Sequence, residues 1–320
     1  MVRIFAHAKY DFIGFRGKAI RATIALLIVG IAAMAVRKIN YSVEFTGGTL
    51  LRITSTKGPI QVESVRAGLE TVKIHDAEIT PMDAGQYMIR GTVTGADPNN
   101  TEITSKAMSA ALDQSLGKDN WRNDGSHSVG PKVGGELRTK AFLAIFLSFF
   151  AVLAYLAVRF EWRFGVAAVV ATFHDIVLTI CFIAVMRLEV SLVVVAAVLS
   201  MVGYSLNDTI VIFDRVRENM RKNRRDQLVS VLNQSINETL PRSVLTHATA
   251  LVTLMALTIF GGPVIRPFAL VMFFGVFTGT FSSIFIAAPV LLIVETKWPG
   301  MDGRGGKAGA RGVAARPKPA

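Results

Sequence analysis

The stretch that decides the fold runs from Gly203 to Asn219 and reads GYSLNDTIVIFDRVREN. It places Asp208 inside an apolar run that begins near Val190 and continues to Phe213. An aspartate at the centre of a membrane helix costs about 2.5–3.5 kcal/mol on insertion scales, so it is expected to face a protein interior or a water path rather than lipid. Two interpretations follow from this segment alone: a polar contact between helices, or a site that binds and releases a proton.

The rest of the chain has the composition of an integral membrane protein. Of its 320 residues, 51% are hydrophobic and only 18% are charged, which is beyond the usual range of a soluble domain. Six apolar segments are long enough, or nearly long enough, to cross a membrane. They are Ile20–Val36, Thr139–Val158, Phe164–Met186, Val190–Phe213, Arg242–Phe260 and Pro267–Val294. We therefore expect a mainly α-helical membrane protein with one span, a domain of globular composition, and then five spans.

The domain between the first two spans has a clear pattern of elements. Residues 49–54, 77–81, 87–93 and 121–129 are typical of strands, and residues 60–71 and 97–116 are typical of helices. The order βαββαβ predicts a ferredoxin-like α+β unit. The only cysteine, Cys181, lies in the third span, so this domain is expected to be held together by its apolar core. The sequence shows no catalytic constellation, metal-ligand spacing or phosphate loop, so we predict no enzyme, no metal and no cofactor.

The distribution of Lys and Arg predicts the orientation. Five of them lie in residues 1–21, six in residues 214–225 and six in residues 295–320. With six spans, all three groups fall on one side, which the positive-inside rule assigns to the cytoplasm. The net charge of +12 is then a topology signal, and nucleic-acid binding is the poorer interpretation. A signal peptide cleaved after Ala33-Met34-Ala35 is an alternative for the first span, but two basic residues follow that site directly.

Polar residues recur at helical spacing in the fourth and fifth spans. Ser200, Tyr204 and Asp208 are four apart and form one stripe. A second stripe consists of Arg242, Thr246, Thr249 and Thr253. If the two stripes face each other, Arg242 stabilises the ionised Asp208, and protonation would release that attraction and let helices shift. The alternative is that Arg242, next to Pro241, extends to the lipid headgroups.

Other residues inside the spans support weaker hypotheses. His174 and Asp175 in the third span form an ionisable pair that is either a proton relay or a packing contact. Gly275, Gly279 and Ser283 are four apart, which predicts close helix packing.

Several motifs, taken together, resemble one family. They are VEFTGGT at residues 43–49, GPKVGGEL at 130–137, NDTIVIFDR at 207–215, FGG at 260–262 and GTFSSIF at 279–285. In this order they are similar to those of the SecF family of bacterial protein translocase subunits, over about residues 10–295. One departure is that Glu44 stands where the family usually has Asp, and Ser42 where it has Gly, so the local turn need not match.

The resemblance implies a function and partners. The family is similar to half of a twelve-span resistance-nodulation-division transporter, so the chain is expected to pair with SecD. The pair would associate with the SecYEG channel, often with YajC, and SecA would drive the cytoplasmic phase. SecD and its partner would use the proton-motive force to pull an unfolded secretory polypeptide outward. The resemblance also points to Asn207, Asp208 and Arg242 in proton coupling, with Asp175 as a weaker candidate.

The predicted organisation has four parts. Residues 1–38 hold the cytoplasmic N-terminus and first span, residues 39–138 the periplasmic domain, residues 139–294 a five-helix bundle with a cytoplasmic loop at 214–241, and residues 295–320 a disordered basic tail. The protein would lie in the bacterial inner membrane with both termini in the cytoplasm. Four glycines, Gly47, Gly48, Gly134 and Gly135, are expected as hinges on which the domain moves. Two alternatives stay open: a self-contained proton-coupled exporter of small molecules or lipids, and an assembly factor without ion coupling.

Overall fold

The computed structural model describes residues 9–74, 77–82, 85–93, 101–223 and 226–298. The chain divides into two compact units. One unit, a helical bundle, holds residues 1–39, 146–188 and 193–320; the other, an α+β domain with the first part of a long helix, holds residues 40–145 and 189–192. The tail beyond residue 298 and the predicted helix start at residue 97 lie outside the described residues.

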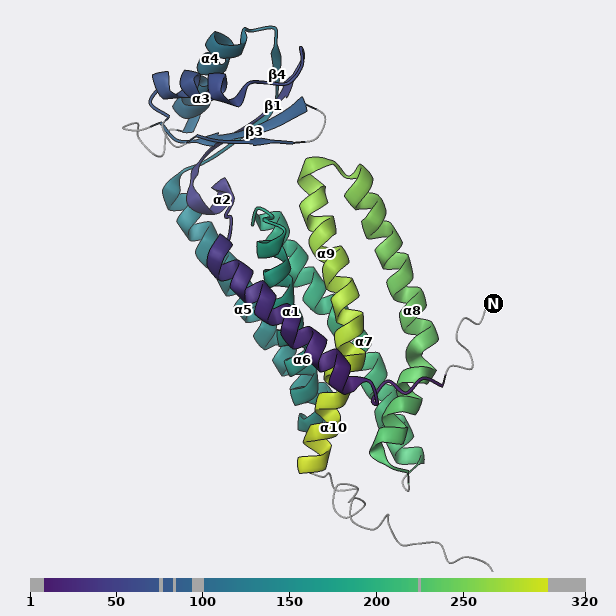
Figure 1. Cartoon of the computed structure of the whole chain (residues 1–320). Helices are drawn as coiled ribbons and strands as arrows, with labels where there is room; N and C mark the ends of the chain where they lie inside the picture. The colour runs from purple at the N-terminus through teal and green to yellow at the C-terminus, as the bar shows by residue number, and fades with distance from the viewer. Residues whose placement is uncertain (1–8, 75–76, 83–84, 94–100, 224–225, 299–320) are drawn as a thin grey trace, which may run out of the picture. The chain divides into compact units, whose positions relative to one another are not determined.

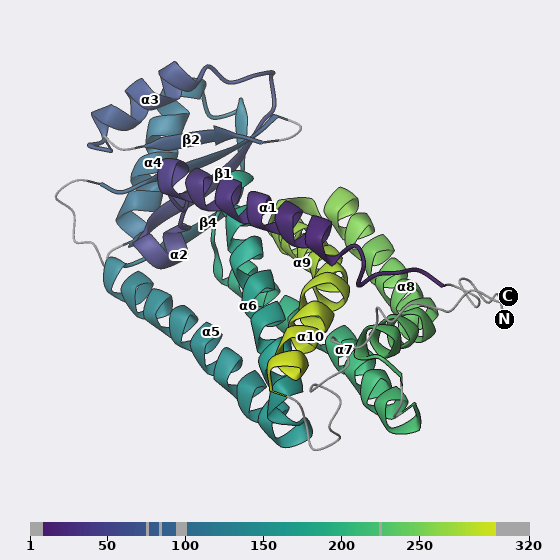
Figure 2. The same cartoon turned by 60° about the horizontal axis from the view of Figure 1, so that its bottom comes forward.

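The described residues contain six helices that are long and apolar enough to cross a membrane, so the prediction of six spans is confirmed. These are α1 (Arg16–Arg37), α5 (Pro131–Arg159), α6 (Trp162–Val185), α7 (Leu192–Lys222), α8 (Leu228–Phe260) and a last span made of α9 (Gly262–Ser282), the π-helix η2 (Ser283–Ala287) and α10 (Ala288–Lys297) (Figures 1 and 2).

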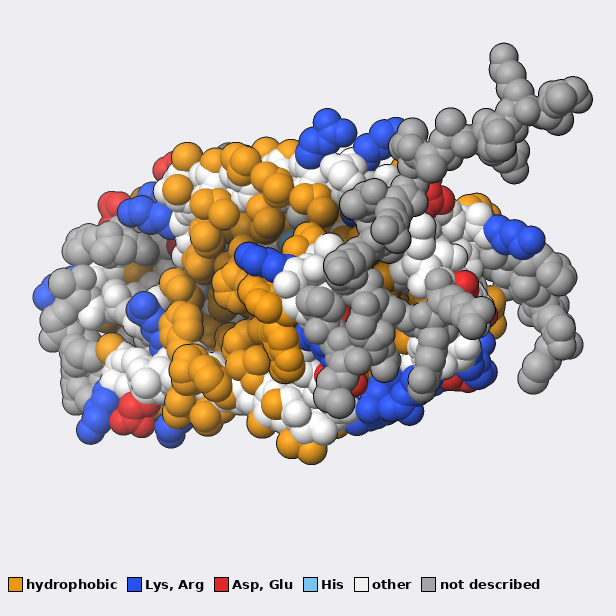
Figure 3. Space-filling model, turned by 90° about the horizontal axis from the view of Figure 1, so that it is seen from below, with side chains coloured by type: hydrophobic (Ala, Val, Ile, Leu, Met, Phe, Trp, Pro, Cys, Tyr) orange, Lys and Arg blue, Asp and Glu red, His pale blue; other side chains and the backbone are white. Residues whose placement is uncertain are grey.

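The core of the bundle is formed by α6, α7 and the last span, in which half or more of the residues are buried. By contrast, few residues of α1 and α5 are fully buried, although α1 lies against α6 (Figures 1 and 2). Their exposed side chains are large and apolar, and Figure 3 shows how much orange surface results. An apolar surface of this extent marks contact with lipid or with another protein.

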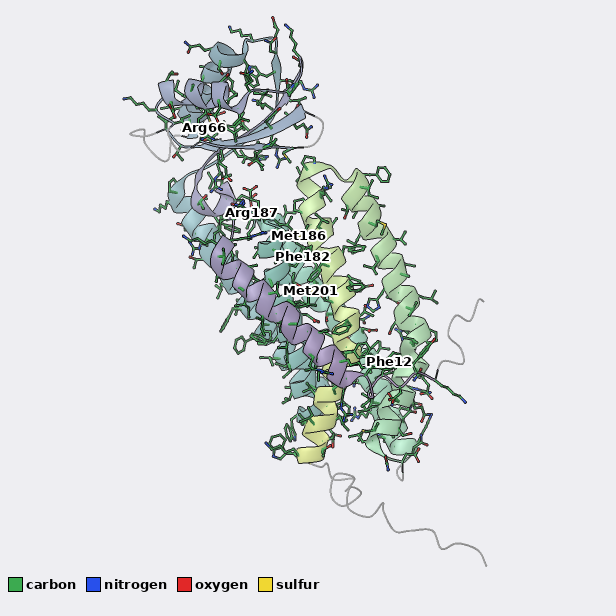
Figure 4. All side chains as sticks on the ribbon, viewed as in Figure 1. Phe12, Arg66, Phe182, Met186, Arg187 and Met201 are labelled. Carbon is green, nitrogen blue, oxygen red and sulfur yellow. The ribbon has the colours of Figure 1, made fainter. Side chains whose placement is uncertain are left out.

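Small residues allow α7 and α9 to approach closely. A Cβ atom on Gly275 would lie 2.0 Å from Cγ of Met201, and one on Gly279 would lie 2.9 Å from Cβ of Ser205. Met201 is labelled in the interior of the bundle in Figure 4. The Ser283 hydroxyl, which follows in the same stripe, bonds to that of Thr209 at 2.7 Å. The spacing of four noted in the sequence therefore coincides with the face that packs on α7.

Within residues 214–241, predicted as a loop, residues 214–222 belong to α7 and residues 228–241 to α8. The prediction was wrong because the apolar pattern ends at Phe213, whereas the helix extends beyond it and is stabilised there by ion pairs between its side chains. Arg215 pairs with Glu218 at 2.6 Å, and Lys222 pairs with Glu218 at 2.6 Å; such pairs stabilise exposed helix ends. The helix α5 likewise extends beyond the apolar pattern, because it begins at Pro131 rather than Thr139, so the predicted domain end falls within a helix.

The segment before α1 runs beside α8 (Figure 2), and two asparagines of α8 bond to it. The Asn237 side chain accepts a hydrogen bond from the Tyr10 N–H at 2.9 Å and donates one to the Tyr10 carbonyl at 2.9 Å. One turn away, Asn233 accepts a hydrogen bond from the Ile13 N–H at 3.0 Å. Phe12, labelled in Figure 4, packs edge-on against Phe285 of η2. We call residues 10–13 the N-terminal strap.

The α+β domain has the predicted order βαββαβ. Its elements are β1 (Gly48–Ser55), α3 (Val62–Thr71), β2 (Glu78–Pro81), β3 (Gln86–Gly91), α4 (Thr101–Leu116) and β4 (Trp121–Val129). The strands form one antiparallel sheet in the order β2-β3-β1-β4, and α3 and α4 cover one of its faces (Figure 1). This is the ferredoxin-like topology, and the prediction is confirmed.

A single apolar core holds this domain together. Leu51 and Ile53 of β1 and Ile89 of β3 are fully buried against Leu69 of α3 and Leu112 of α4. Burying side chains of this size contributes about 1.5–3 kcal/mol each. These residues alternate along the strands, since side chains two apart share a face.

The glycine-rich entrance to the domain is tightly packed. The short helix α2 (Val43–Thr46) begins at Ser42, whose hydroxyl accepts a hydrogen bond from the Glu44 N–H at 3.2 Å. Gly47 and Gly48 follow with φ of 78° and 117°, a backbone conformation that favours glycine. A Cβ atom on Gly134, in the first turn of α5, would lie 2.9 Å from the Gly47 nitrogen. Of the predicted hinge residues, Gly47 thus lies between α2 and β1, Gly48 begins β1, and Gly134 and Gly135 lie in α5.

Candidate functional site

Asp208 is buried within the bundle, with only 4% of its surface exposed. It lies about 24 Å from the first residue of α7 at 1.5 Å per residue. Its Oδ1 atom accepts a hydrogen bond from the Ser243 hydroxyl of α8 at 2.5 Å. Its Oδ2 atom is also buried, and within the described residues it has no hydrogen-bond partner. Because buried polar atoms are nearly always paired, an unpaired carboxylate oxygen is an open position for a proton.

A histidine completes the surroundings of Asp208. His247 follows Ser243 by one turn of α8 and is buried. Its Nδ1 atom donates to the Ser243 carbonyl at 2.7 Å, since a carbonyl can only accept. The ring packs edge-on against Tyr204, with centroids 5.4 Å apart. Both His247 and Arg242 lie close enough to interact electrostatically with the Asp208 carboxylate.

The structure turns a different face of α8 toward Asp208 than the expected one. Ser200, Asn207 and the whole stripe of Arg242, Thr246, Thr249 and Thr253 are exposed in this chain. Part of that stripe lines an open groove of about 390 Å³ together with Tyr204, Leu254 and Met272. The residues that do approach Asp208 are one position further along, and successive helical residues are about 100° apart. Sequence reasoning thus missed Ser243 and His247.

A signal for the correct face was present in the sequence. Ser235, Thr239, Ser243 and His247 are each four residues apart, and all four are buried. The stripe that begins at Arg242 was favoured because it contains a cation. A charged residue at the end of a span can reach water on its own, whereas a serine or a histidine within the span cannot, so the less charged stripe is the one that faces inward.

Asp175 has a different environment from that of Asp208. It is fully buried at 0% exposure, and its Oδ2 atom accepts hydrogen bonds from Ser205 of α7 and Ser282 of α9, both at 2.6 Å. Its Oδ1 atom lies 2.9 Å from Nδ1 of His174. The other ring nitrogen of His174 lies 3.3 Å from the Thr23 hydroxyl of α1. This cluster therefore ties α6 to three other helices.

The π-helix η2 connects the two aspartate environments. Ser282, which bonds to Asp175, is the last residue of α9, and Ser283 opens η2. The Ser283 hydroxyl bonds to Thr209, the residue after Asp208. A change in the geometry of η2 would therefore alter the surroundings of both carboxylates. Short π-helical segments are frequent at functional sites.

In the described part of the chain, no group of three or more His, Cys, Asp or Glu side chains is placed to hold a metal ion. A buried carboxylic acid such as Asp208 is chemically able to bind and release a proton. Charge changes there would act on α8 through Ser243, and on Arg242 and His247 through the electric field.

Comparison with known families assigns the chain. The sequence model of "Protein export membrane protein SecD/SecF, C-terminal" matches residues 108–297, which is more than half of the chain. The chain belongs to the SecD/SecF family. The "SecD/SecF GG Motif" matches residues 32–58, which include α2, Gly47 and Gly48. The resemblance seen in the sequence is therefore confirmed.

Relatives within the SecD/SecF family narrow the assignment. The chain is 46% identical over 308 residues to protein translocase subunit SecF of Gemmatimonas aurantiaca, with 94% of this chain and 92% of the relative covered. It is 39% identical over 287 residues to the SecF subunit of Magnetococcus marinus, with coverages of 89% and 92%. The chain is thus a SecF-type translocase subunit, which is a transport role.

Solved structures of SecDF agree with this family assignment. The crystal structure of SecDF from Thermus thermophilus, titled a translocon-associated membrane protein, matches with a TM-score of 0.79 and 33% identity. A super-membrane-facing form of SecDF matches with a TM-score of 0.66 and 33% identity. About nine-tenths of this chain is covered in both cases, but it spans only 39% of each SecDF chain. The match to a joint SecDF chain supports SecD as the partner.

Proposed function

We propose that this SecF-type subunit works with SecD to convert the proton-motive force into completion of protein export through SecYEG, after SecA has started translocation. The observation that carries the proposal is the buried Asp208 carboxylate, which has one oxygen bonded to Ser243 and one without a partner. A buried acid between two packed helices is expected to be functional in a membrane protein. We assign proton binding to Asp208, with Arg242 and Asn207 as its supporting residues.

Proton binding at this site would change the contact between α7 and α8. Ionised Asp208 attracts His247 and Arg242 and accepts a hydrogen bond from the Ser243 hydroxyl; the neutral acid loses the charge that attracts them. The energy is sufficient for such a change. One proton that crosses 100 mV yields about 2.3 kcal/mol, which shifts a two-state equilibrium by about fiftyfold.

We propose that Asp175 has a secondary part in this cycle. Its three hydrogen bonds join α6, α7 and α9, so it is suited to hold the helices in register while Asp208 changes charge. A relay role for the His174–Asp175 pair is the competing possibility, and the stability measurement described below separates the two.

We propose the bacterial inner membrane as the location, with both termini in the cytoplasm. The support is the clustering of Lys and Arg before α1, at the end of α7 and after α10. The α+β domain would then lie in the periplasm, where it would meet the emerging polypeptide.

We propose that SecD covers much of the exposed apolar surface of the bundle, including the groove lined by Tyr204, Thr246, Thr249 and Thr253. SecYEG and YajC would contact the assembled pair, and the cargo would be an unfolded secretory polypeptide. We propose further that the domain moves on Gly47 and Gly48, whose positive φ values favour glycine, because Gly134 and Gly135 are held within the helix α5.

The test is export into membrane vesicles that contain SecYEG, SecA, SecD and this chain, with and without an imposed proton gradient. Asp208→Asn keeps the size and most hydrogen bonding of the side chain but cannot titrate. We expect it to insert and to bind SecD, and to abolish the part of export that depends on the gradient, while initiation driven by ATP persists. The matched control is Asp214→Asn, because Asp214 lies on the same helix in an exposed pair with Arg159. If export with Asp208→Asn responds to the gradient as export with the unaltered chain does, proton coupling at Asp208 is rejected. The remaining function is then that of an assembly factor without ion coupling.

A further inference from the structure

A line of buried polar side chains on α8 leads away from Asp208. Ser243, Thr239 and Ser235 follow one another at intervals of four residues and are all buried. The interval corresponds to about 6 Å along the helix at 1.5 Å per residue. Buried hydroxyl groups are costly unless they have a hydrogen-bond partner. Here Thr239 donates to the Ser235 carbonyl at 3.0 Å, and Ser235 to the Val231 carbonyl at 2.7 Å, which leaves their oxygen lone pairs able to accept.

The far end of this line lies next to the acid Glu238, which faces an open cavity. Asn219 of α7 donates to the Ser235 hydroxyl at 3.0 Å and to Oε2 of Glu238 at 2.7 Å. Arg215 pairs with the same Glu238 oxygen at 2.5 Å. Glu238 lies in the wall of an open cavity of about 450 Å³, which is also lined by Asp11, Asn233 and Asn237. The carboxylate of Glu238 thus lies between the buried line and the surface.

We propose that Ser243, Thr239 and Glu238 form the path by which a proton passes between Asp208 and this cavity, with Glu238 as the group that exchanges protons with bulk water. The proposal rests on the proposed function, since it presupposes that Asp208 binds a transported proton. It adds the direction of transfer, the residues and the exit. His247 lies on the opposite side of Ser243 from Thr239, so it belongs to the binding site and not to this path.

The transfer needs no change in oxidation state. The O–H bond of protonated Asp208 breaks as the Ser243 oxygen takes that proton, and Ser243 releases its own hydroxyl proton toward Thr239. Thr239 repeats this exchange toward Glu238, where a new O–H bond forms; the proton then leaves to water in the cavity. Ser243 and Thr239 are separated by about 6 Å along the helix axis, which is longer than one hydrogen bond, so the proposed path includes a bridging water molecule in that step.

Asn219 and Arg215 are positioning residues for this path. The amide of Asn219 donates both of its contacts, to Ser235 and Glu238, so it orients them and does not itself accept the proton. Arg215 holds Glu238 from the α7 side, and Gln234 donates to the other Glu238 oxygen at 2.9 Å. Other charged groups at this end include Lys9 and Asp11, which also line the cavity, and Glu218 and Lys222; all four are exposed.

The test measures gradient-driven proton flux in liposomes that contain this chain with SecD and SecYEG. Thr239→Val keeps the shape of the side chain and removes the hydroxyl, and we expect it to slow flux about tenfold or more, the cost of one lost hydrogen bond in the transfer path. Thr239→Ser should restore flux. Thr258→Val is the control, because Thr258 is a back-bonded threonine near the other end of α8.

A second pair of variants tests the terminal acid. Glu238→Gln retains hydrogen-bond capacity but cannot take a proton, and we expect a similar loss of flux. Glu218→Gln is matched to it, since both acids pair with Arg215, and it should leave flux unchanged. Insertion and SecD binding are measured for each variant.

The outcomes separate this path from the proposed function. Loss of flux in Asp208→Asn together with normal flux in both Thr239→Val and Glu238→Gln would overturn the path and leave the function of Asp208 standing. Normal flux in Asp208→Asn would overturn both. Failure of Thr239→Ser to restore flux lost in Thr239→Val would show that packing and not the hydroxyl is responsible, and the path would be rejected.

Discussion

Asp208 and Asp175 are both buried in one bundle, yet their surroundings suit them to opposite tasks. Asp175 uses both oxygens in hydrogen bonds, whereas Asp208 leaves one oxygen without a partner in the described residues. A fully bonded carboxylate resists change, because each donor around it would be left unpaired. A partly bonded one has less to lose on protonation.

This difference predicts how the two asparagine variants behave. Asp175→Asn would set an amide N–H₂ against hydroxyl and imidazole groups that now donate to the carboxylate, and we expect a loss of about 1–3 kcal/mol for each group left unsatisfied. Asp208→Asn should cost less. Thermal unfolding of the purified complex with SecD measures both. If Asp175→Asn has normal stability but no proton flux, His174 and Asp175 form a relay instead.

Glu189 gives a pH-dependent prediction outside the spans. Burial raises the pKa of its carboxyl group, against the lowering effect of Arg90 and Arg52. The folded state then holds the proton more tightly than the unfolded state, so the stabilisation is full below the ordinary value of 4.5 and is lost as pH rises through the raised pKa. We expect faster hydrogen exchange at the Val190 amide, which bonds to Asn40, as pH rises, beyond the intrinsic increase of exchange with pH. In Glu189→Gln this extra dependence should disappear.

At the same scale, the sequence was enough to find Asp208 but not its neighbours. A charge in an apolar run is visible without any structure. Two stripes of α8, one with Arg242 and one with Ser243, both contain polar residues. They differ by a rotation of about 100° about the helix axis, and this rotation decides which stripe faces Asp208. Ser243 and His247 were therefore missed for lack of packing information and not for lack of a pattern.

At the scale of elements, the close contact between α7 and α9 makes a sharp prediction. Gly279→Ala would place a Cβ atom 2.9 Å from Ser205, and overpacking of this kind costs about 1–3 kcal/mol. Gly203→Ala is the matched control, because nothing lies within 4 Å of the Cβ position of that α7 glycine. The unfolding temperature of the complex should fall only for Gly279→Ala. Equal stability of the two would mean that the helices can separate freely.

The helices were predicted better in number than in extent. Hydropathy detects where a helix crosses lipid, but α7 and α8 continue beyond it on side-chain ion pairs. The π-helix η2 was not predicted at all. Its sequence, SIFIA, has nothing that favours an extra residue in the turn; the hydroxyls of Ser282 and Ser283 find their partners on other helices, which no local pattern contains.

At the scale of the whole molecule, orientation can be tested with single cysteines. The native Cys181 is buried, so it should react little with a membrane-impermeant thiol reagent. We expect Ser55→Cys in the α+β domain to be labelled in intact spheroplasts, and Ser230→Cys near the start of α8 to be labelled only after the membrane is opened. The reverse pattern would contradict the orientation.

The layout of one span, a ferredoxin-like domain and five spans could be predicted because each part has its own periodicity. The path of residues 189–192 could not be predicted from the sequence. This short connection between α6 and α7 belongs to the same unit as the α+β domain, and the Glu44 carboxylate accepts a hydrogen bond from the Leu192 N–H at 2.6 Å. Contacts between residues so far apart in the chain leave no trace in local sequence.

The N-terminal strap sets an order for biosynthesis. Its hydrogen bond from Ile13 to Asn233 joins residues 220 apart, so the asparagines that bind the strap have not yet been made when the first span leaves the ribosome. At about 5–20 residues per second, roughly 10 to 45 seconds pass before the two asparagines are made. During that interval α1 is held in the membrane by its apolar surface and, once α6 has been made, by its contact with that helix; the strap closes as one of the last events of assembly.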